Sequence, residues 1–309
     1  MDQELLKKLF RRLLFSFIIL LLSLRVYSAP CCGAGFTIPS IITSEDKAQL
    51  ATSYSRAKIH ADVFTNGDWR ERQEDDITET YKIEGAHIFK DRYQAGFSIP
   101  YQSRQRSGAQ SDESSGLGDI SLQFGFEYLP DWNYNPYRPK GIVYLSVITP
   151  TGRSIYESKD GSGIDARGRG FWGLGLGAVH TKKWGRYDAN SNFEMHYSLP
   201  KVVHNKTTSG TVHPSYGGSF AFGGGLNFSN LRLGGLINWS YEGPTDVSGT
   251  TSSNGELKRF ATGSILISYM LPENQSVIAS YSDQTFFGSP FNTSLSKSIT
   301  LFYQKRWER

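Results

Sequence analysis

Apolar and polar positions alternate along most of the chain after residue 48. Between residues 119 and 128 every second residue is apolar or aromatic, and the apolar set is Ile120, Leu122, Phe124, Phe126 and Tyr128. The same alternation runs through residues 192–199, 231–241 and 298–307. A period of two residues is typical of a β-strand with one apolar and one polar face. The pattern therefore predicts an all-β protein.

Counting the alternating segments gives twelve strands, at 48–64, 75–88, 93–106, 117–129, 142–150, 171–182, 187–200, 214–229, 231–242, 257–271, 275–285 and 293–307. Their connections alternate between mostly short turns, with 130–141 as the longer exception, and long polar loops. Short turns at one end and long loops at the other are typical of outer-membrane barrels. We therefore predict a 12-stranded antiparallel transmembrane β-barrel of the bacterial outer membrane. The even strand number puts both termini on the periplasmic, short-turn side.

The two faces of the predicted strands indicate which side meets lipid. The polar face carries Gly, Ser, Asn, Gln and several charges, which is too polar for a dry core. A closed barrel with its apolar face outward pairs every backbone group within the bilayer. A soluble β-sandwich would need the reverse distribution. We expect interfacial girdles formed by aromatic residues near the strand ends: Tyr101, Tyr128, Tyr144, Trp172, Tyr197, Phe228, Tyr241, Tyr269, Tyr281 and Trp307.

The first 47 residues precede the predicted barrel, which spans 48–309. Four basic residues stand before the apolar run 13–24, and Ser28 ends a plausible cleavage site. This arrangement predicts a signal peptide over 1–28, and an uncleaved anchor is the alternative. Residues 29–47 form an N-terminal segment. Two interpretations of it stay open: a plug in the periplasmic half of the lumen, or a disordered leader.

Composition narrows the classes of protein and of partner. Aromatic residues make up 14% of the chain, which excludes a disordered protein. The one long apolar run lies at the N-terminus, which excludes an α-helical membrane protein. The net charge of +4 is scattered, so no nucleic-acid partner is expected. The expected partners are outer-membrane lipids, a small-molecule solute and the barrel assembly machinery, and the oligomeric state stays open. That machinery reads a C-terminal aromatic residue, which here is Trp307, followed by Glu308 and Arg309.

Two short glycine-containing elements carry a family resemblance. Gly116-Leu117-Gly118-Asp119 leads into an alternating strand, and Thr149-Pro150-Thr151-Gly152 stands at the end of a later one. Together with the strand count, they resemble the outer-membrane transporter family grouped with the phenol meta-cleavage pathway protein. The resemblance implies a membrane channel for small compounds, often aromatic or hydrophobic.

The polar face supplies the candidate site residues. Nine candidates for lining the lumen are Lys82, Glu84, Asp119, Gln123, Glu127, Glu194, His196, Arg232 and Asn238. Mixed charges could set up a transverse field that orients a solute, or they could form internal ion pairs in a wet lumen. Small residues on the same face leave space and favour a pore: Gly173, Gly175, Gly177, Ser219, Ala221, Gly223 and Gly225.

One long loop and one cysteine pair carry further candidates. The glycine-rich loop 151–170 contains Asp160, Asp165, Arg167 and Arg169, and it could fold inward as a constriction or remain an external tip. Cys31 and Cys32 are adjacent, which disfavours a relaxed disulfide between them. The open alternatives are a redox pair or metal site, a disulfide to a partner, a pair of thiols tucked into the barrel, and a strained disulfide between the two neighbours. Two sulfurs without a nearby histidine make a poor zinc site. No metal and no cofactor are expected.

An enzyme is not expected. His196 and Ser198 share one strand face two residues apart, about 7 Å, which exceeds hydrogen-bond reach. The sequence has no Gly-x-Ser-x-Gly elbow. The functional prediction is a porin-like channel for passive passage of a small solute. The alternative is a structural or surface-binding barrel with a filled lumen that acts through its long extracellular loops.

Overall fold

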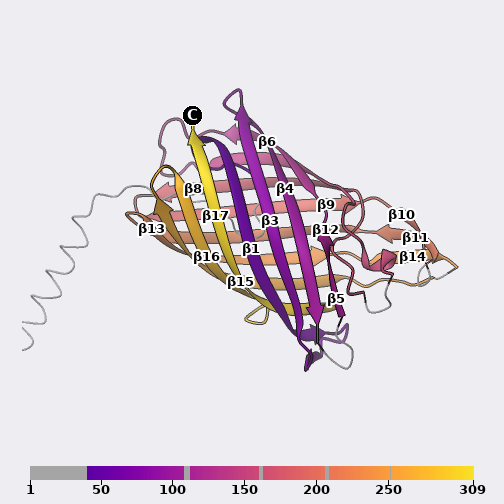
Figure 1. Ribbon diagram of the computed structural model, residues 1–309. Helices are drawn as coiled ribbons and strands as arrows, with labels where there is room; N and C mark the ends of the chain where they lie inside the picture. The colour runs from indigo at the N-terminus through magenta and orange to yellow at the C-terminus, as the bar shows by residue number, and fades with distance from the viewer. Residues whose placement is uncertain (1–39, 108–111, 160–162, 206–208, 251) are drawn as a thin grey trace, which may run out of the picture.

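The computed structural model describes residues 40–309, apart from 108–111, 160–162, 206–208 and 251. Within this part, twelve antiparallel strands form one closed barrel (Figure 1). The strands are β1 (Asp46–Val63), β3 (Asp76–Phe89), β4 (Tyr93–Arg106), β6 (Ser121–Leu129), β7 (Lys140–Ile148), β8 (Gly173–Trp184), β9 (Tyr187–Ser198), β12 (Tyr216–Phe228), β13 (Leu231–Glu242), β15 (Lys258–Leu271), β16 (Gln275–Asp283) and β17 (Thr293–Glu308). The predicted twelve-stranded barrel is confirmed.

Pairing between the first and last strands closes the barrel. β1 and β17 are antiparallel along almost their whole length, with Tyr54 opposite Leu301 and register shifts near Asp46 and Ile59. Every other barrel strand pairs with its neighbour in chain order. A closed sheet has no open edge, so its backbone groups are satisfied without water.

The outer and inner faces of the barrel differ as the alternation predicts. On the outside, apolar side chains are exposed to the surroundings, as at Ile265 (67% exposed) and Leu176 (64%). On the inside, polar side chains are buried, as at Asn192 (1%) and Arg232 (2%). An exposed apolar belt around a polar interior is the arrangement that suits a lipid bilayer.

Several loops are more structured than the sequence suggests. The strand expected over 117–129 is interrupted at 118–120, and β5 (Asp112–Leu117) continues the pairing with β4 beyond the barrel wall. β2 (Trp69–Glu71) pairs with the end of β1. β10 (Lys201–His204), β11 (Ser209–Pro214) and β14 (Thr245–Gly249) form a separate three-stranded sheet beyond one end of the barrel (Figure 1).

This three-stranded sheet packs on the loop between β7 and β8. Val203, Val212 and Val247 form a buried cluster with Phe171, and Tyr156 packs against it. Tyr156 belongs to the short 3-10 helix η1 (Ile155–Glu157). Across the described residues, no helix has the length and apolar character to cross a membrane.

One predicted girdle residue lies on the other face. Tyr144 points into the barrel, is 2% exposed and donates a hydrogen bond to Asn192 Oδ1 at 3.0 Å. Its neighbours Val143 and Leu145 face outward instead. The assignment of Tyr144 to an interfacial girdle is therefore wrong.

Candidate functional site

A polar chamber of about 340 Å³ lies in the middle of the lumen. We call this cavity the chamber. Its walls come from strands on opposite sides of the barrel and carry charged, amide and hydroxyl groups, including Lys82, Glu84, Ser98, Gln123, Tyr144, Ser146, Glu194, His196, Ser240 and Glu242. A segment from one end of the barrel and a loop from the other complete it, through Ser40 and Arg169.

Residues 40–45, here called the inner segment, lie against the inner wall at the short-turn end. Ile42 is fully buried and packs with Ala86 and Ile88 of β3. Its backbone N–H donates to Gln94 Oε1 at 2.7 Å, and Gln94 Nε2 donates to the Ile42 carbonyl at 3.3 Å. A side chain replacing Gly96 would collide with the carbonyl oxygen of Ser40. The barrel wall and the inner segment are therefore complementary in shape.

Charged groups on the wall hold both ends of the inner segment. Lys140 Nζ donates to the Ser44 carbonyl at 3.0 Å and lies 2.9 Å from the Glu45 carboxylate. At the chamber side, Ser40 Oγ donates to Glu84 Oε1 at 3.0 Å. Residues 1–39, which include the predicted signal peptide and Cys31 and Cys32, lie outside the described residues.

The described parts of the loop 151–170, residues 151–159 and 163–170, lie at the opposite end of the chamber, which Arg169 lines. Asp119 accepts hydrogen bonds from the backbone N–H groups of Gly152 (2.9 Å), Arg169 (2.6 Å) and Gly170 (3.1 Å). Thr151 Oγ1 also donates to the Gly118 carbonyl at 2.7 Å. The two elements that carry the family resemblance are thus in direct contact, and together they anchor this loop.

A second carboxylate stabilises the loop from within. Asp165 forms an ion pair with Arg153 (2.6 Å) and accepts hydrogen bonds from Ser158 Oγ and from the Lys159 N–H. Burial raises the pKa of the Asp165 carboxyl, but these contacts outweigh burial and lower that pKa to about 2. Asp160 of the same loop lies outside the described residues.

Five of the nine sequence-predicted lumen residues line the chamber: Lys82, Glu84, Gln123, Glu194 and His196. Lys82 and Glu84 form an ion pair at 3.0 Å on β3. Across the chamber, Glu194 accepts a hydrogen bond from Ser146 Oγ at 3.5 Å. Carboxylates therefore face each other across the chamber, and the β3 wall also carries the positive charge of Lys82.

Three other candidates are buried in the barrel interior and are not among the residues that line the chamber. Glu127 lies 3.3 Å from Lys140, and Arg232 pairs with Asp188 at 2.6 Å. Asn238 Nδ2 donates to Ser240 Oγ at 2.9 Å. The ninth candidate, Asp119, precedes β6 and binds loop amides, so the structure does not place it among the residues lining the chamber.

Sequence reasoning did not single out four charged or amide residues of the interior: Gln94, Lys140, Asp188 and Glu242. Gln94, Asp188 and Glu242 lie at inward positions of strands that alternation had located, so their phase relative to the apolar residues was a usable signal. Lys140 lies before the strand expected over 142–150, so alternation gave no signal for it. The alternation does not predict which inward-facing residues contact one another across the lumen.

No known family and no curated protein matches this sequence. Among solved structures, an outer membrane channel from Pseudomonas putida F1 is similar with a TM-score of 0.71 and 13% identity, covering 85% of this chain and 96% of that one. The β domain of the Bordetella autotransporter BrkA has a TM-score of 0.48 and 12% identity, covering 85% and 100%. The fold is that of an outer-membrane β-barrel.

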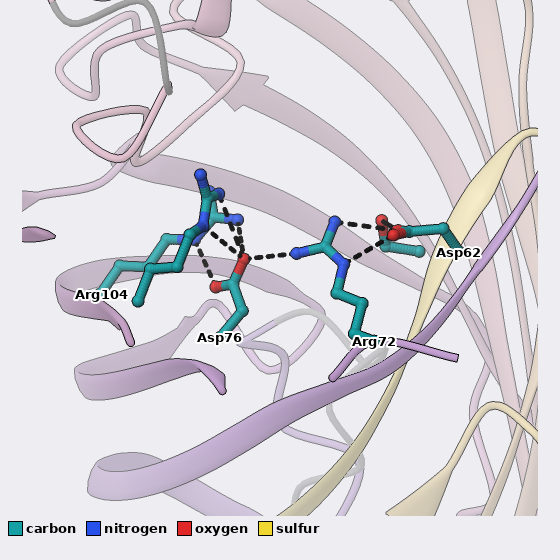
Figure 2. Close-up of polar contacts among 6 residues, drawn as sticks. Asp62, Arg72, Asp76 and Arg104 are labelled. Carbon is teal, nitrogen blue, oxygen red and sulfur yellow. Dashed lines mark hydrogen bonds and ion pairs between the residues drawn. The ribbon is translucent and has the colours of Figure 1, made fainter. Parts of the chain in front are cut away.

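The outer-membrane barrel carries a second charged cluster at its long-loop end. Asp76 is fully buried and accepts hydrogen bonds from Arg72 (2.7 Å), Arg104 (2.7 and 2.8 Å) and Arg106 (3.2 Å), as Figure 2 shows in part. Arg72 also pairs with Asp62 at 2.6 Å. The cluster ties the connection after β2 to β1, β3 and β4, so its contacts brace the rim of the barrel.

The histidine considered for catalysis is engaged with the loop. His196 Nε2 lies 2.6 Å from Arg169 Nη1 and 3.2 Å from a Glu242 carboxylate oxygen. Within the described ranges, no group of three or more His, Cys, Asp or Glu residues is placed to hold a metal ion. The chemistry that the chamber offers is hydrogen bonding and charge complementarity.

Proposed function

We propose that the protein is a channel for passive passage of a small solute across the bacterial outer membrane, with both termini in the periplasm. The observation that carries the proposal is the polar chamber inside a closed barrel whose outer face is apolar. A cavity of this size is comparable to small-molecule sites. The inner segment borders the chamber through Ser40, and the loop 151–170 borders it through Arg169.

We infer that the inner segment is a plug at the periplasmic end. Its support is the burial of Ile41 and Ile42 among wall residues and the hydrogen bonds to Gln94 and Lys140. The segment is joined to the barrel at one described end only, through β1. It can therefore leave the lumen without breaking any pairing between barrel strands.

The lining of the chamber favours a small polar solute. Hydroxyl groups of Ser98, Ser146 and Ser240 and the carboxylates of Glu84 and Glu194 can replace water around such a solute. An aromatic or hydrophobic solute, which the family resemblance implies, stays an expectation to be compared in the same assay.

A surface-binding barrel that acts through its loops is the second candidate. The observation in its favour is the three-stranded sheet of β10, β11 and β14, which gives the long loops a folded surface with its own apolar cluster. In that case the lumen would carry no current.

Single-channel conductance in a planar bilayer tests the channel and the plug together. We compare the mature protein with Ile42→Asp, which puts a charge into a fully buried apolar contact and should expel the inner segment. Ile42→Val is the matched control, because it keeps an apolar side chain at the same buried position. Ile42→Asp should conduct several times more than the wild type, and Ile42→Val should conduct like the wild type.

Each result has a distinct meaning once heat-modifiable gel mobility shows that the barrels are folded. Equal conductance in the wild type and Ile42→Asp would contradict the plug but leave the channel. Absence of conductance from both folded proteins would refute the channel and support action through the loops. Liposome swelling rates, measured with small polar, charged and aromatic solutes, then rank the candidate solute classes by their rate of passage.

A further inference from the structure

A second cavity of about 510 Å³ lies on the long-loop side of the chamber. We call it the outer cavity. It is lined by Ile155 and Tyr156 of η1, by the end of the loop 151–170 and Phe171 after it, by Pro214 of β11 and Lys258 of β15, and by residues of the connections after β13 and β16. Two residues line both cavities, Arg169 and Glu242. These two side chains therefore form a shared wall between the outer cavity and the chamber.

The Arg169 side chain bridges from the loop to the barrel wall. Its Nη1 atom lies 2.6 Å from His196 Nε2 on β9, and its Nη2 donates to Glu242 Oε1 on β13. Glu242 also contacts His196 at 3.2 Å. Backbone contacts to Asp119 fix where the side chain of Arg169 starts, so its reach across the opening follows from the fold.

We propose that Arg169 determines the size and charge preference of the passage between the outer cavity and the chamber. This inference rests on the proposed channel function. The guanidinium narrows the opening by its contacts with two strands. Its positive charge lies at one side of the chamber, and the carboxylates of Glu84 and Glu194 line the same chamber. Rings of charged side chains set ion preference in pores in this way.

The bridge is suited to repeated opening. The Arg169 and Glu242 side chains are 41% and 31% exposed, and ion pairs this accessible are weak because water competes for both charges. Rotation about the Arg169 side-chain bonds is enough to separate the pair, while the backbone N–H groups of residues 169 and 170 stay bound to Asp119. Opening therefore requires no movement of a strand.

The test uses Ile42→Asp as background, so that the inner segment does not limit the current. Arg169→Ala is compared with Arg167→Ala, a matched control in the same loop. Arg167 donates to Ser114 Oγ at 3.0 Å and lines neither cavity. Single-channel conductance and the reversal potential across a salt gradient are measured for each.

Arg169→Ala should raise the conductance about twofold or more and shift the reversal potential toward cations, since a positive charge leaves the pore lining. Arg167→Ala should change neither quantity. Arg169→Lys keeps the charge but loses the two-pronged contact, so it should retain the reversal potential and raise the conductance less.

Two failures are distinguishable. If the Ile42→Asp background carries no current, the channel function fails and this inference fails with it. If the background conducts and Arg169→Ala behaves as Arg167→Ala does, the channel stands and the role of Arg169 is refuted. Arg169→Gln, which also removes the charge, supplies the same test if Arg169→Ala does not reach the folded, heat-modifiable form.

Discussion

The buried pair of Asp188 and Arg232 is the residue-level contact with the largest expected effect on stability. Asp188 accepts two hydrogen bonds from the Arg232 guanidinium, at 2.6 and 2.9 Å, and a third from Asn227 at 2.6 Å. Removing one partner of a buried pair takes away the opposite charge that compensates the desolvation of the other. We predict that Asp188→Ala lowers the free energy of unfolding by about 3–5 kcal/mol.

Urea unfolding of the purified barrel, followed by tryptophan fluorescence, measures this change. Glu273→Ala is the control, because Glu273 pairs with Lys305 in an exposed turn and surface pairs contribute about 0–1 kcal/mol. Equal midpoints for the two variants would show that water enters the lumen around Arg232 and compensates its charge.

Gly177 is required by the position of Tyr144. A Cβ atom at Gly177 would overlap the ring and hydroxyl of Tyr144, which is buried and bonded to Asn192. Because overpacking a fixed side chain costs about 1–3 kcal/mol, Gly177→Ala should lower the urea midpoint. Gly235→Ala is the matched control, since its nearest contact would be an ordinary 3.6 Å. A neutral Gly177→Ala would mean that Tyr144 can rotate into the chamber.

Tyr144 also shows where sequence reasoning stops at this scale. Ile142, Val143, Tyr144 and Leu145 form a continuous apolar run, so alternation gives no phase in this part of β7. Asp119 shows the opposite case, because it is in phase with the inward residues of β6 but lies before the strand begins. Its carboxylate therefore binds loop amides, which periodicity alone could not reveal.

At the scale of elements, the long strands could be predicted and the short loop strands could not. Each barrel strand has nine or more residues with one apolar face, which makes a readable pattern. β10, β11 and β14 have four to six residues, and β11 pairs with β14 across the whole β12–β13 hairpin. Non-local pairing of such short segments leaves little trace in a single sequence.

The loop 151–170 depends on ionised Asp165, which gives it a defined response to pH. The pKa of Asp165 is lowered from 3.8 to about 2, so its stabilising contribution is complete above about pH 4 and is lost as the pH falls through 2. We predict that pepsin cleaves this loop faster at pH 2 than at pH 4. Each cleavage rate is divided by the rate at which pepsin cleaves an unfolded substrate at the same pH, and the difference should remain after this correction.

Asp165→Asn is the control for this pH response. The amide cannot ionise, so the loop should be cleaved at a similar corrected rate at both pH values. A wild-type loop that resists pepsin equally at pH 2 and pH 4 would show that the Asp119 contacts alone keep it in place.

For the whole molecule, the closed barrel follows from strand number and face polarity, whereas the contents of the lumen do not. Twelve strands enclose a space that side chains alone can leave open or fill. The structure adds chain from both ends of the barrel: the inner segment lines the chamber on one side, and Arg169 of the loop 151–170 lines it on the other. Which of the segments turns inward depends on contacts such as Gln94 with Ile42, between residues 52 positions apart.

The orientation of the barrel gives a prediction for the intact cell. Long loops face outward and short turns face the periplasm in outer-membrane barrels, because the longer connections are the ones that project from the cell. An epitope inserted after Gly67, at the exposed tip of the β1–β2 hairpin, should bind antibody on intact cells. The same epitope after Tyr137, in the exposed connection between β6 and β7, should bind only after the outer membrane is permeabilised. Labelling of the Tyr137 epitope on intact cells would show the opposite orientation. The inner segment would then lie at the outer surface. There it would obstruct the entry of solute from outside rather than its exit into the periplasm.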